Sequence, residues 1–340
     1  MSKPYTENQH GVECTDPHAA AIPPRKARAT LAGHLRIIRA DYWVKNVFVL
    51  PGIAVALLVF PQAVQDGILW KVLLGFVATC LVASSNYVLN EVLDAPFDRL
   101  HPRKCNRPVP AGKVSVPLAY VQWLLMMAAG VGLGLLVSPA LSATLLSLWI
   151  MGCIYNIPPV RSKDLPYIDV LTEAVNNPIR MLIGWYMVEP SVIIPVSLLF
   201  SYWMIGAYFM ALKRFAEVRH INDADRAGRY RRSFAYYTEA RLLNSIVFYA
   251  SAAMMFFGAF AIRYRTELVL AFPFIAWVIA VYFNLSFKHD SAAASPERLY
   301  REGGLMAAVC ICTAVIIVLL LMDVPFLRTF FAPSVASPLP

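Results

Sequence analysis

Long apolar segments alternate with short polar ones along most of this chain. The apolar segments are each about 18 to 22 residues long, which is enough for an α-helix to cross the hydrocarbon core of a bilayer. Several connections between them are very short, as at Ser138-Pro139 and Glu189-Pro190, so neighbouring spans must run antiparallel. The pattern predicts an all-α, polytopic membrane bundle of about nine transmembrane helices. The predicted spans are 43–60, 69–90, 117–137, 139–156, 168–188, 191–212, 241–262, 268–287 and 304–325.

Composition agrees with a membrane bundle. Of the 340 residues, 59% are hydrophobic and only 15% are charged, whereas soluble domains are nearer 45–50% apolar. The net charge of +9 gathers in clusters between the apolar runs and forms no basic face of a soluble fold. We therefore expect membrane lipids and phosphorylated substrates as partners, and no nucleic acid. The predicted organisation is a disordered cytoplasmic tail over 1–34, a membrane-embedded domain over 35–327 and a C-terminal tail over 328–340.

The positive charges predict the orientation in the membrane. Most of the 30 lysines and arginines lie before the first span or after the second, fourth, sixth and eighth spans. These segments share one side of the membrane, because consecutive spans alternate in direction. An excess of lysine and arginine marks the cytoplasmic side. We therefore expect the N-terminus and the charged clusters in the cytoplasm, and the C-terminus outside.

The most informative cluster closes the second predicted span, in the sequence NEVLDAPFDRLHPRKCNRPVPAG. Asn90, Asp94 and Asp98 are spaced four apart, so their side chains can meet on one helix face. Carboxylates where a span meets water are costly unless they bind something. Their oxygens suit Mg²⁺, which can in turn hold a diphosphate, and Lys104 and Arg107 would take the remaining phosphate charge. The alternative is a solvated loop with ordinary helix-end charges.

A second polar cluster follows the sixth predicted span and reads LKRFAEVRHINDADRAGRYRRS. It contains the cations Lys213 and Arg214 and the acids Glu217 and Asp225. Because the acids are embedded among bases, the cluster is a second candidate site for phosphate or metal. The alternative is a basic amphipathic helix that lies on the lipid surface.

Three further cations stand near the predicted membrane boundary or inside it. Lys45 begins the first span, and Lys163 follows Pro158-Pro159, where a broken helix must line protein or water. Arg180 lies about a dozen residues into the fifth span, where a charge costs several kcal/mol unless it is paired or hydrated. A polar cavity is favoured there over an ion pair with a buried acid. Together the clusters predict a polar, Mg²⁺-binding mouth on the cytoplasmic side of an apolar bundle.

These residues resemble the signature of the UbiA superfamily of intramembrane prenyltransferases. In that signature an Asn is followed four residues later by Asp, again four later by Asp, and then by a basic stretch with Arg-Pro. The resemblance covers roughly residues 35–325. It implies that Asp94 and Asp98 hold Mg²⁺ on a diphosphate, and that the second loop with Glu217 and Asp225 completes the site. The matching positions are Asn90, Asp94, Asp98, Lys104, Arg107-Pro108 and Gly112.

Within that superfamily the chain is similar to the decaprenyl-phosphate phosphoribosyltransferase branch. The resemblance implies a transferase of the bacterial plasma membrane that moves phosphoribosyl from phosphoribosyl pyrophosphate to a polyprenyl phosphate. Phosphate groups of the donor would lie on Lys104, Arg107, Lys213 and Arg214, and the head of the lipid near Lys45, Lys163 or Arg180. The features that carry this similarity are Trp43–Asn46, His101-Pro102, the run Lys213–Glu217 and the spacing of Lys163, Asp169 and Arg180.

Two other functions stay open from the sequence. The same Mg²⁺ site could hold a polyprenyl diphosphate whose prenyl group passes to an aromatic or other small acceptor. In that case aromatic side chains such as Tyr87 and Tyr202 would shield the allylic cation. The third possibility is a non-catalytic transporter, because broken helices and an intramembrane arginine also occur in transporters.

Overall fold

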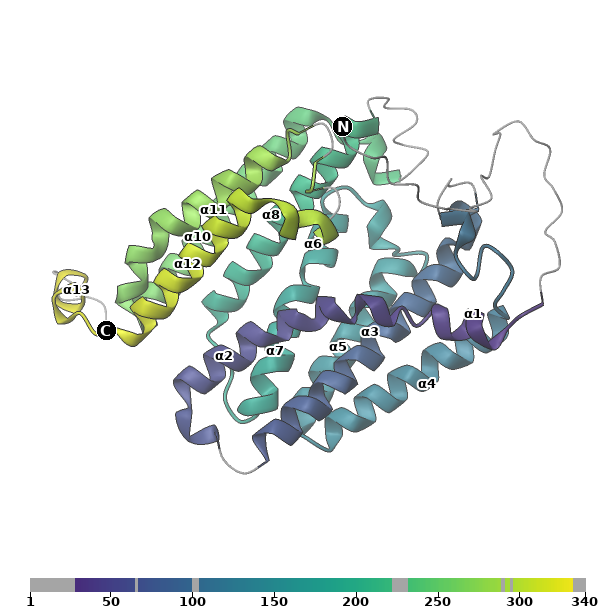
Figure 1. The fold of residues 1–340 in the computed structure, drawn as a ribbon, viewed down its shortest axis with the longest axis horizontal. Helices are drawn as coiled ribbons and strands as arrows, with labels where there is room; N and C mark the ends of the chain where they lie inside the picture. The colour runs from purple at the N-terminus through teal and green to yellow at the C-terminus, as the bar shows by residue number, and fades with distance from the viewer. Residues whose placement is uncertain are drawn as a thin grey trace, which may run out of the picture.

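The computed structural model describes residues 28–64, 67–99, 104–221, 232–288, 291–293 and 296–332. Over these ranges the chain is helical and contains no strand (Figure 1). Short 3₁₀ segments join several of the helices, and the longest covers Ala40–Val49. The α-helices are α1 (Leu31–Arg36), α2 (Leu50–Val59), α3 (Ile68–Asp98), α4 (Val116–Leu135), α5 (Pro139–Asn156), α6 (Ile168–Ala174), α7 (Asn176–Val188), α8 (Val196–Ile221), α10 (Glu239–Tyr264), α11 (Phe272–Leu285), α12 (Gly303–Leu321) and α13 (Pro325–Phe330).

The predicted membrane bundle is confirmed. In the described ranges, eight helical segments are long and apolar enough to span a bilayer, so the chain is an integral membrane protein. The remaining predicted span, 168–188, is divided into α6 and α7, which meet at Val175. Pro178 explains the break, because proline has no N–H to bond the carbonyl of Ala174 one turn earlier.

Two helices extend further than the hydropathy pattern predicts. Helix α3 continues past the predicted end at residue 90, through Pro96, to Asp98. Helix α8 continues past residue 212 to Ile221. Asp94, Asp98 and Glu217 therefore lie on the polar last turns of long helices, beyond the ends of the predicted spans. Hydropathy marks only where a helix leaves the apolar layer, and helical backbone can continue beyond that point.

The predicted tails are partly helical. Helix α1 begins inside the stretch 1–34 that we expected to be disordered, because the hydroxyl of Thr30 accepts the N–H of Gly33 at 3.0 Å and caps the helix. At the other end, α13 extends into the predicted tail 328–340. The remaining parts of these tails, 1–27 and 333–340, lie outside the described residues.

Glycines allow α2 and α7 to pack with their backbones in contact. A Cβ on Gly52 would collide with the carbonyl oxygen of Met181, and a Cβ on Gly184 would collide with that of Val49. Small residues at such contacts let helices approach closely where no water drives them together. The glycines thereby hold the first span tightly against α7.

The packing brings the polar ends of several helices together. Helix α3 packs on α4 and α5, α7 packs on α2, and α8 packs on α6 and α10. Helices α6 to α8 therefore lie between one group formed by α3 to α5 and another formed by α10 to α12 (Figure 1). The C-terminal ends of α3, α5 and α8 and the start of α6 meet at one end of the bundle. Each predicted polar cluster that falls in the described residues, except the region of Lys45 and Arg180, is found at this end.

Candidate active site

Asp94 on α3 binds two cations from the connection that follows α5. Its Oδ1 atom lies 3.0 Å from Nη2 of Arg161 and 2.5 Å from Nζ of Lys163. Lys163 also donates to Oδ1 of Asn156 at 2.9 Å, and the same oxygen accepts from Nδ2 of Asn90 at 2.6 Å. The predicted residues Asn90, Asp94 and Lys163 therefore belong to one polar network around the end of α5.

Asp98, one turn further along α3, pairs with Lys104 and Arg107 of the basic loop, which the sequence had assigned to phosphate. Nη1 of Arg107 lies 2.5 Å from its Oδ2 atom, and Nζ of Lys104 lies 3.9 Å from its Oδ1 atom. Asp98 is 4% exposed. Both aspartates thus face basic side chains. This basic surround supplies the charge that a phosphate group requires.

Glu91 fixes the basic loop and the start of the first span against α3. It is 1% exposed and accepts Nη2 of Arg39 at 3.0 Å and the backbone N–H of Val109 at 3.1 Å. Glu91 stands next to Asn90 in the motif, yet both of its oxygens are used in structural contacts. It therefore positions the loop that carries Arg107 and is not a free metal ligand.

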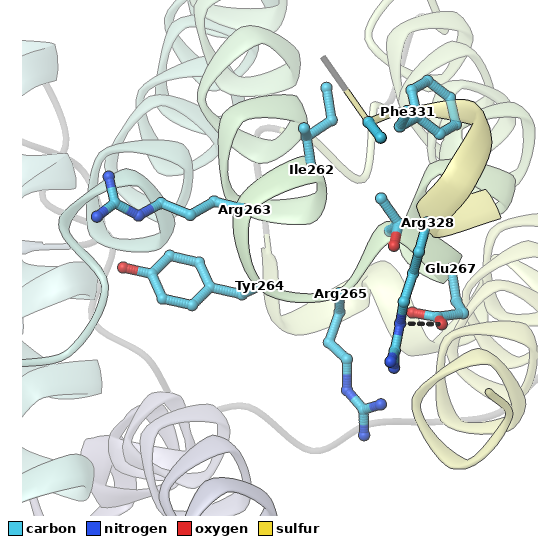
Figure 2. Close-up of a pocket in the computed structure, with 9 residues that line it drawn as sticks. Ile262, Arg263, Tyr264, Arg265, Glu267, Arg328 and Phe331 are labelled. Carbon is cyan, nitrogen blue, oxygen red and sulfur yellow. Dashed lines mark ion pairs between the residues drawn. The ribbon is translucent and has the colours of Figure 1, made fainter. Parts of the chain in front are cut away.

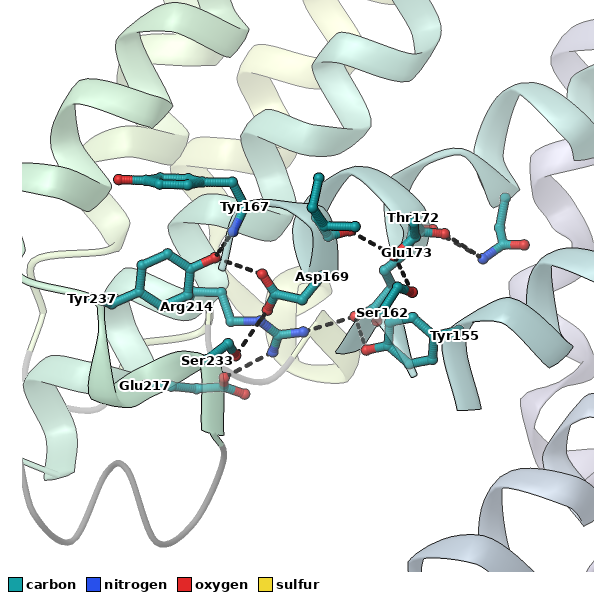
Figure 3. Close-up of polar contacts among 12 residues, drawn as sticks. Tyr155, Ser162, Tyr167, Asp169, Thr172, Glu173, Arg214, Glu217, Ser233 and Tyr237 are labelled. Atoms are coloured by element: carbon teal, nitrogen blue, oxygen red, sulfur yellow. Dashed lines mark hydrogen bonds and ion pairs between the residues drawn. The ribbon is translucent and has the colours of Figure 1, made fainter. Parts of the chain in front are cut away.

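A second network gathers around Arg214 of α8 (Figure 3). Its guanidinium pairs with Asp169 at 3.2 Å, with Glu173 at 2.7 Å and with Glu217 at 3.0 Å. Arg214 is 3% exposed and Asp169 is fully buried. Arg214 was predicted to hold phosphate, but here its charge is matched by three carboxylates. Glu217, predicted as a metal ligand, is held by Arg214 in the same way.

Tyrosines complete this second network and connect it with the first. Tyr237 donates to Oδ1 of Asp169 at 2.5 Å and accepts the backbone N–H of Tyr167 at 2.7 Å. Burial and the adjacent carboxylate of Asp169 raise the pKa of Tyr237 well above its ordinary value. Tyr155, next to Asn156 at the end of α5, donates to Glu173 at 2.9 Å. The end of α5 therefore joins the network of Asp94 to that of Arg214.

The other predicted cations occupy different surroundings. Lys45 is exposed on the 3₁₀ segment, with its Nζ 4.1 Å from the centre of the Tyr42 ring. Lys213 is half-buried on α8 beside Arg214. Arg180 lies on α7, where its Nε donates to Oδ1 of Asn46 at 3.2 Å. Of the predicted metal ligands, Asp225 lies outside the described residues.

The residues of the first network suit Mg²⁺ only together with a substrate. The described residues contain no group of three or more histidine, cysteine or acidic side chains that could hold a metal ion. Mg²⁺ usually takes one or two protein carboxylates, and substrate phosphates and water complete its coordination. Asp94 and Asp98, with cations around them, fit that requirement. Without a substrate, Mg²⁺ would have to compete with four positive side chains for the two carboxylates.

A cavity of about 320 Å³ lies at the opposite end of the bundle. It lies between the end of α10 and α13, with Arg265, Glu267 and Arg328 in its wall (Figure 2). None of the predicted site residues lines it. This cavity is therefore separate from the two polar networks.

Sequence reasoning missed several members of the networks, namely Arg39, Asn156, Glu173 and Tyr237. Asn156 had a usable signal, because it lies two residues before the helix-breaking Pro158-Pro159. The partners of Glu173 and Tyr237 could not be predicted, since they depend on which helices are neighbours.

Comparison with known proteins gives three results. The model of the UbiA prenyltransferase family matches residues 47–309. A decaprenyl-phosphate phosphoribosyltransferase of Corynebacterium glutamicum is 29% identical over 257 residues, covering 71% of this chain and 72% of that protein. The enzyme of the same name from Mycobacterium tuberculosis is 31% identical over 234 residues, covering 68% and 74%.

The fold is also similar to that of a solved structure. A UbiA homolog from Archaeoglobus fulgidus, bound to DMAPP and Mg²⁺, superposes with a TM-score of 0.63 at 17% sequence identity. The alignment covers 84% of this chain and 99% of that one. At 17% identity the similarity shows a shared fold, which is the arrangement of the helices.

Proposed function

Because this chain belongs to the UbiA prenyltransferase family, and is thus a transferase, we propose that it moves phosphoribosyl from phosphoribosyl pyrophosphate to a polyprenyl phosphate. The phosphoribosyltransferases that share about 30% of its residues over two thirds of the chain support this choice of reaction. Family membership also favours a transferase over the non-catalytic transporter that the sequence left open.

One observation carries the proposal: four cations surround the two aspartates of α3. Arg161 and Lys163 contact Asp94, and Lys104 and Arg107 contact Asp98. With Mg²⁺ on the carboxylates, these cations would be available to pair with the oxygens of a pyrophosphate group. A donor with the high negative charge of a pyrophosphate would thus contact both the metal and the cations.

The chemistry follows from this charge distribution. The bond from C1 of ribose to the pyrophosphate oxygen breaks, and pyrophosphate leaves with the electron pair. An oxygen of the polyprenyl phosphate then forms the new bond to C1, so phosphate replaces pyrophosphate on the sugar. The cations near Asp94 and Asp98 stabilise the charge that develops on the leaving group. The acceptor phosphate is already an anion, so no dedicated general base is required.

Mg²⁺, when bound by Asp94 and Asp98, would neutralise the pyrophosphate and make it a better leaving group. Asn90 lies one turn below Asp94 and is oriented by Asn156. Its amide can therefore position a hydroxyl or phosphate oxygen of the donor. We also propose that this end of the bundle faces the cytoplasm, because the connections on this side carry most of the lysines and arginines of the sequence.

Prenyl transfer is the second candidate, and the bound DMAPP of the structural relative is the observation that favours it. In that reaction the diphosphate would be part of the lipid, and its allylic chain would extend past Tyr87 into the bundle. The two reactions differ in which substrate carries the diphosphate.

A labelled-donor experiment separates the two reactions. The purified full chain in lipid nanodiscs would receive phosphoribosyl pyrophosphate labelled in the ribose, a polyprenyl phosphate and Mg²⁺. We expect label in the organic phase only when lipid phosphate and Mg²⁺ are both present. Label that enters the lipid phase only from a prenyl diphosphate and a small acceptor would establish prenyl transfer instead.

A further inference from the structure

Arg180 differs from Arg39 and Arg214 in its choice of partners. Arg39 is paired with Glu91, and Arg214 with three acids. Arg180 donates only to neutral oxygens, the side-chain carbonyl of Asn46 at 3.2 Å and the backbone carbonyl of Asn176 at 3.4 Å. In the described part of the chain it makes no ion pair with an acid. Its positive charge therefore has no carboxylate partner within the described residues.

The position of Arg180 makes that charge costly. Asn46, its partner, donates through Nδ2 to the sulfur of Cys80 at 3.3 Å, and Cys80 lies near the middle of the spanning helix α3. Tyr87 and Tyr202 also lie close enough to Arg180 to interact with it electrostatically. An arginine at such depth is rare unless it is paired or lines a polar pathway. Its guanidinium has five N–H donors, and only two have partners among the described residues, while the side chain is partly exposed.

Arg180 is also aligned with the first network. Tyr87, Asn90 and Asp94 are spaced three and four apart, so they follow one face of α3. At 1.5 Å per residue, Tyr87 lies about 10 Å and Cys80 about 20 Å from Asp94 along the helix. Arg180 is therefore located beyond Asn90, on the membrane side of the aspartates. A pyrophosphate at Asp94 and a ribose near Asn90 would occupy the intervening length.

From these observations we propose that Arg180 and Asn46 form a deep anion subsite that binds a phosphate monoester. The choice of a phosphate monoester rests on the proposed phosphoribosyl transfer, in which two groups have this chemistry. One is the head of the polyprenyl phosphate, and the other is the 5-phosphate of the donor. The bound phosphate supplies the negative charge that Arg180 lacks, and its oxygens accept the unused N–H donors.

Direct binding tests the subsite without turnover. The full chain in nanodiscs would be titrated with farnesyl phosphate and with ribose 5-phosphate, and each titration repeated with the phosphate-free farnesol or ribose. The variant Arg180→Gln keeps a donor for Asn46 but removes the charge. Arg263→Gln, at the far end of α10, is the matched control for loss of an arginine.

We expect Arg180→Gln to weaken binding of at least one phosphate probe by roughly 10- to 100-fold, because a charged hydrogen bond is lost. Farnesol and ribose should bind this variant as they bind the native chain, and Arg263→Gln should bind every probe normally. Loss confined to farnesyl phosphate assigns the subsite to the acceptor, and loss confined to ribose 5-phosphate assigns it to the donor. Unchanged affinity for both phosphates would overturn the proposal.

Two further variants keep the test decisive. If Arg180→Gln does not fold, Arg180→Lys retains the charge but not the fork of donors, and Asn46→Ala removes the group that orients it. Both should weaken phosphate binding, and normal binding by both would overturn the subsite. The binding result is independent of the labelled-donor result. A chain that fails to use phosphoribosyl pyrophosphate can still show Arg180-dependent phosphate binding, and an active chain can lack it.

Discussion

The ammonium group of Lys163 lies 2.5 Å from Oδ1 of Asp94, although the two residues are 69 positions apart in the chain. This contact joins the connection after α5 to the acidic end of α3. It places a cation directly on a carboxylate that we propose for metal binding. Asp94 therefore has cationic partners before any substrate arrives.

Removing the carboxylate of Asp94 should abolish nearly all transfer. We expect Asp94→Asn to lower kcat/KM for phosphoribosyl pyrophosphate by about 10²- to 10³-fold or more, because the metal and its charge stabilisation are lost. The labelled-donor assay measures this effect. Asp323→Asn, an exposed acid at the other end of the bundle, should retain native activity. An Asp94→Asn variant with native turnover would remove the basis of the proposed site.

Removing Arg214 should destabilise the fold more than it alters substrate binding. Arg214→Met leaves three carboxylates without their shared cation, two of them partly buried and one fully buried. We expect the free energy of unfolding to fall by about 3–5 kcal/mol, measured by chemical unfolding in mixed micelles. Lys288→Gln breaks an exposed pair with Glu302 and should cost less than about 1 kcal/mol. Equal costs for the two variants would contradict the structural role of Arg214.

The hydroxyl of Tyr237 should give the protein an alkaline limit. Its pKa is raised in the folded state, so its stabilising contribution is fully present below the ordinary tyrosine pKa of about 10. The contribution is lost as the pH rises toward the higher folded value. Tyr237→Phe should reduce stability by about 1 kcal/mol at neutral pH and flatten the decline above pH ~10. A decline that is identical in both proteins would exclude Tyr237 as its source.

The contact between α2 and α7 should tolerate no added methyl group. Gly184→Ala would force a Cβ against the carbonyl oxygen of Val49, and we expect a loss of about 1–3 kcal/mol in unfolding free energy. Gly132 of α4 has open space around its Cβ position. Gly132→Ala should therefore be neutral or stabilising by up to about 1 kcal/mol. The two variants compared in one unfolding assay separate packing from helix propensity.

Sequence alone predicted the membrane bundle and the acidic end of α3, because both depend on local patterns. Hydropathy marks the spans, and the spacing of Asn90, Asp94 and Asp98 is visible in the chain. The same reasoning could indicate the break between α6 and α7, since Pro178 removes a helix hydrogen bond at a known position.

Pairings between distant helices were not visible in the sequence. Arg214 was expected to hold phosphate, but Asp169 and Glu173, 45 and 41 positions earlier, surround it. Whether a cation serves a substrate or an internal acid depends on which helix lies beside it. Arg180, in contrast, makes no ion pair with an acid among the described residues. The polar cavity that the sequence favoured around it therefore stays a prediction.

The glycines between α2 and α7 have a consequence for the depth of Arg180. Backbones in direct contact cannot slide past one another without a clash, so the axial register of the two helices is set by Gly52 and Gly184. Asn46 precedes α2 and Arg180 belongs to α7, so that register determines whether they meet. A shift of a single residue, about 1.5 Å, would exceed the tolerance of their hydrogen bond. Two residues without side chains therefore set how far into the membrane an anion could be held.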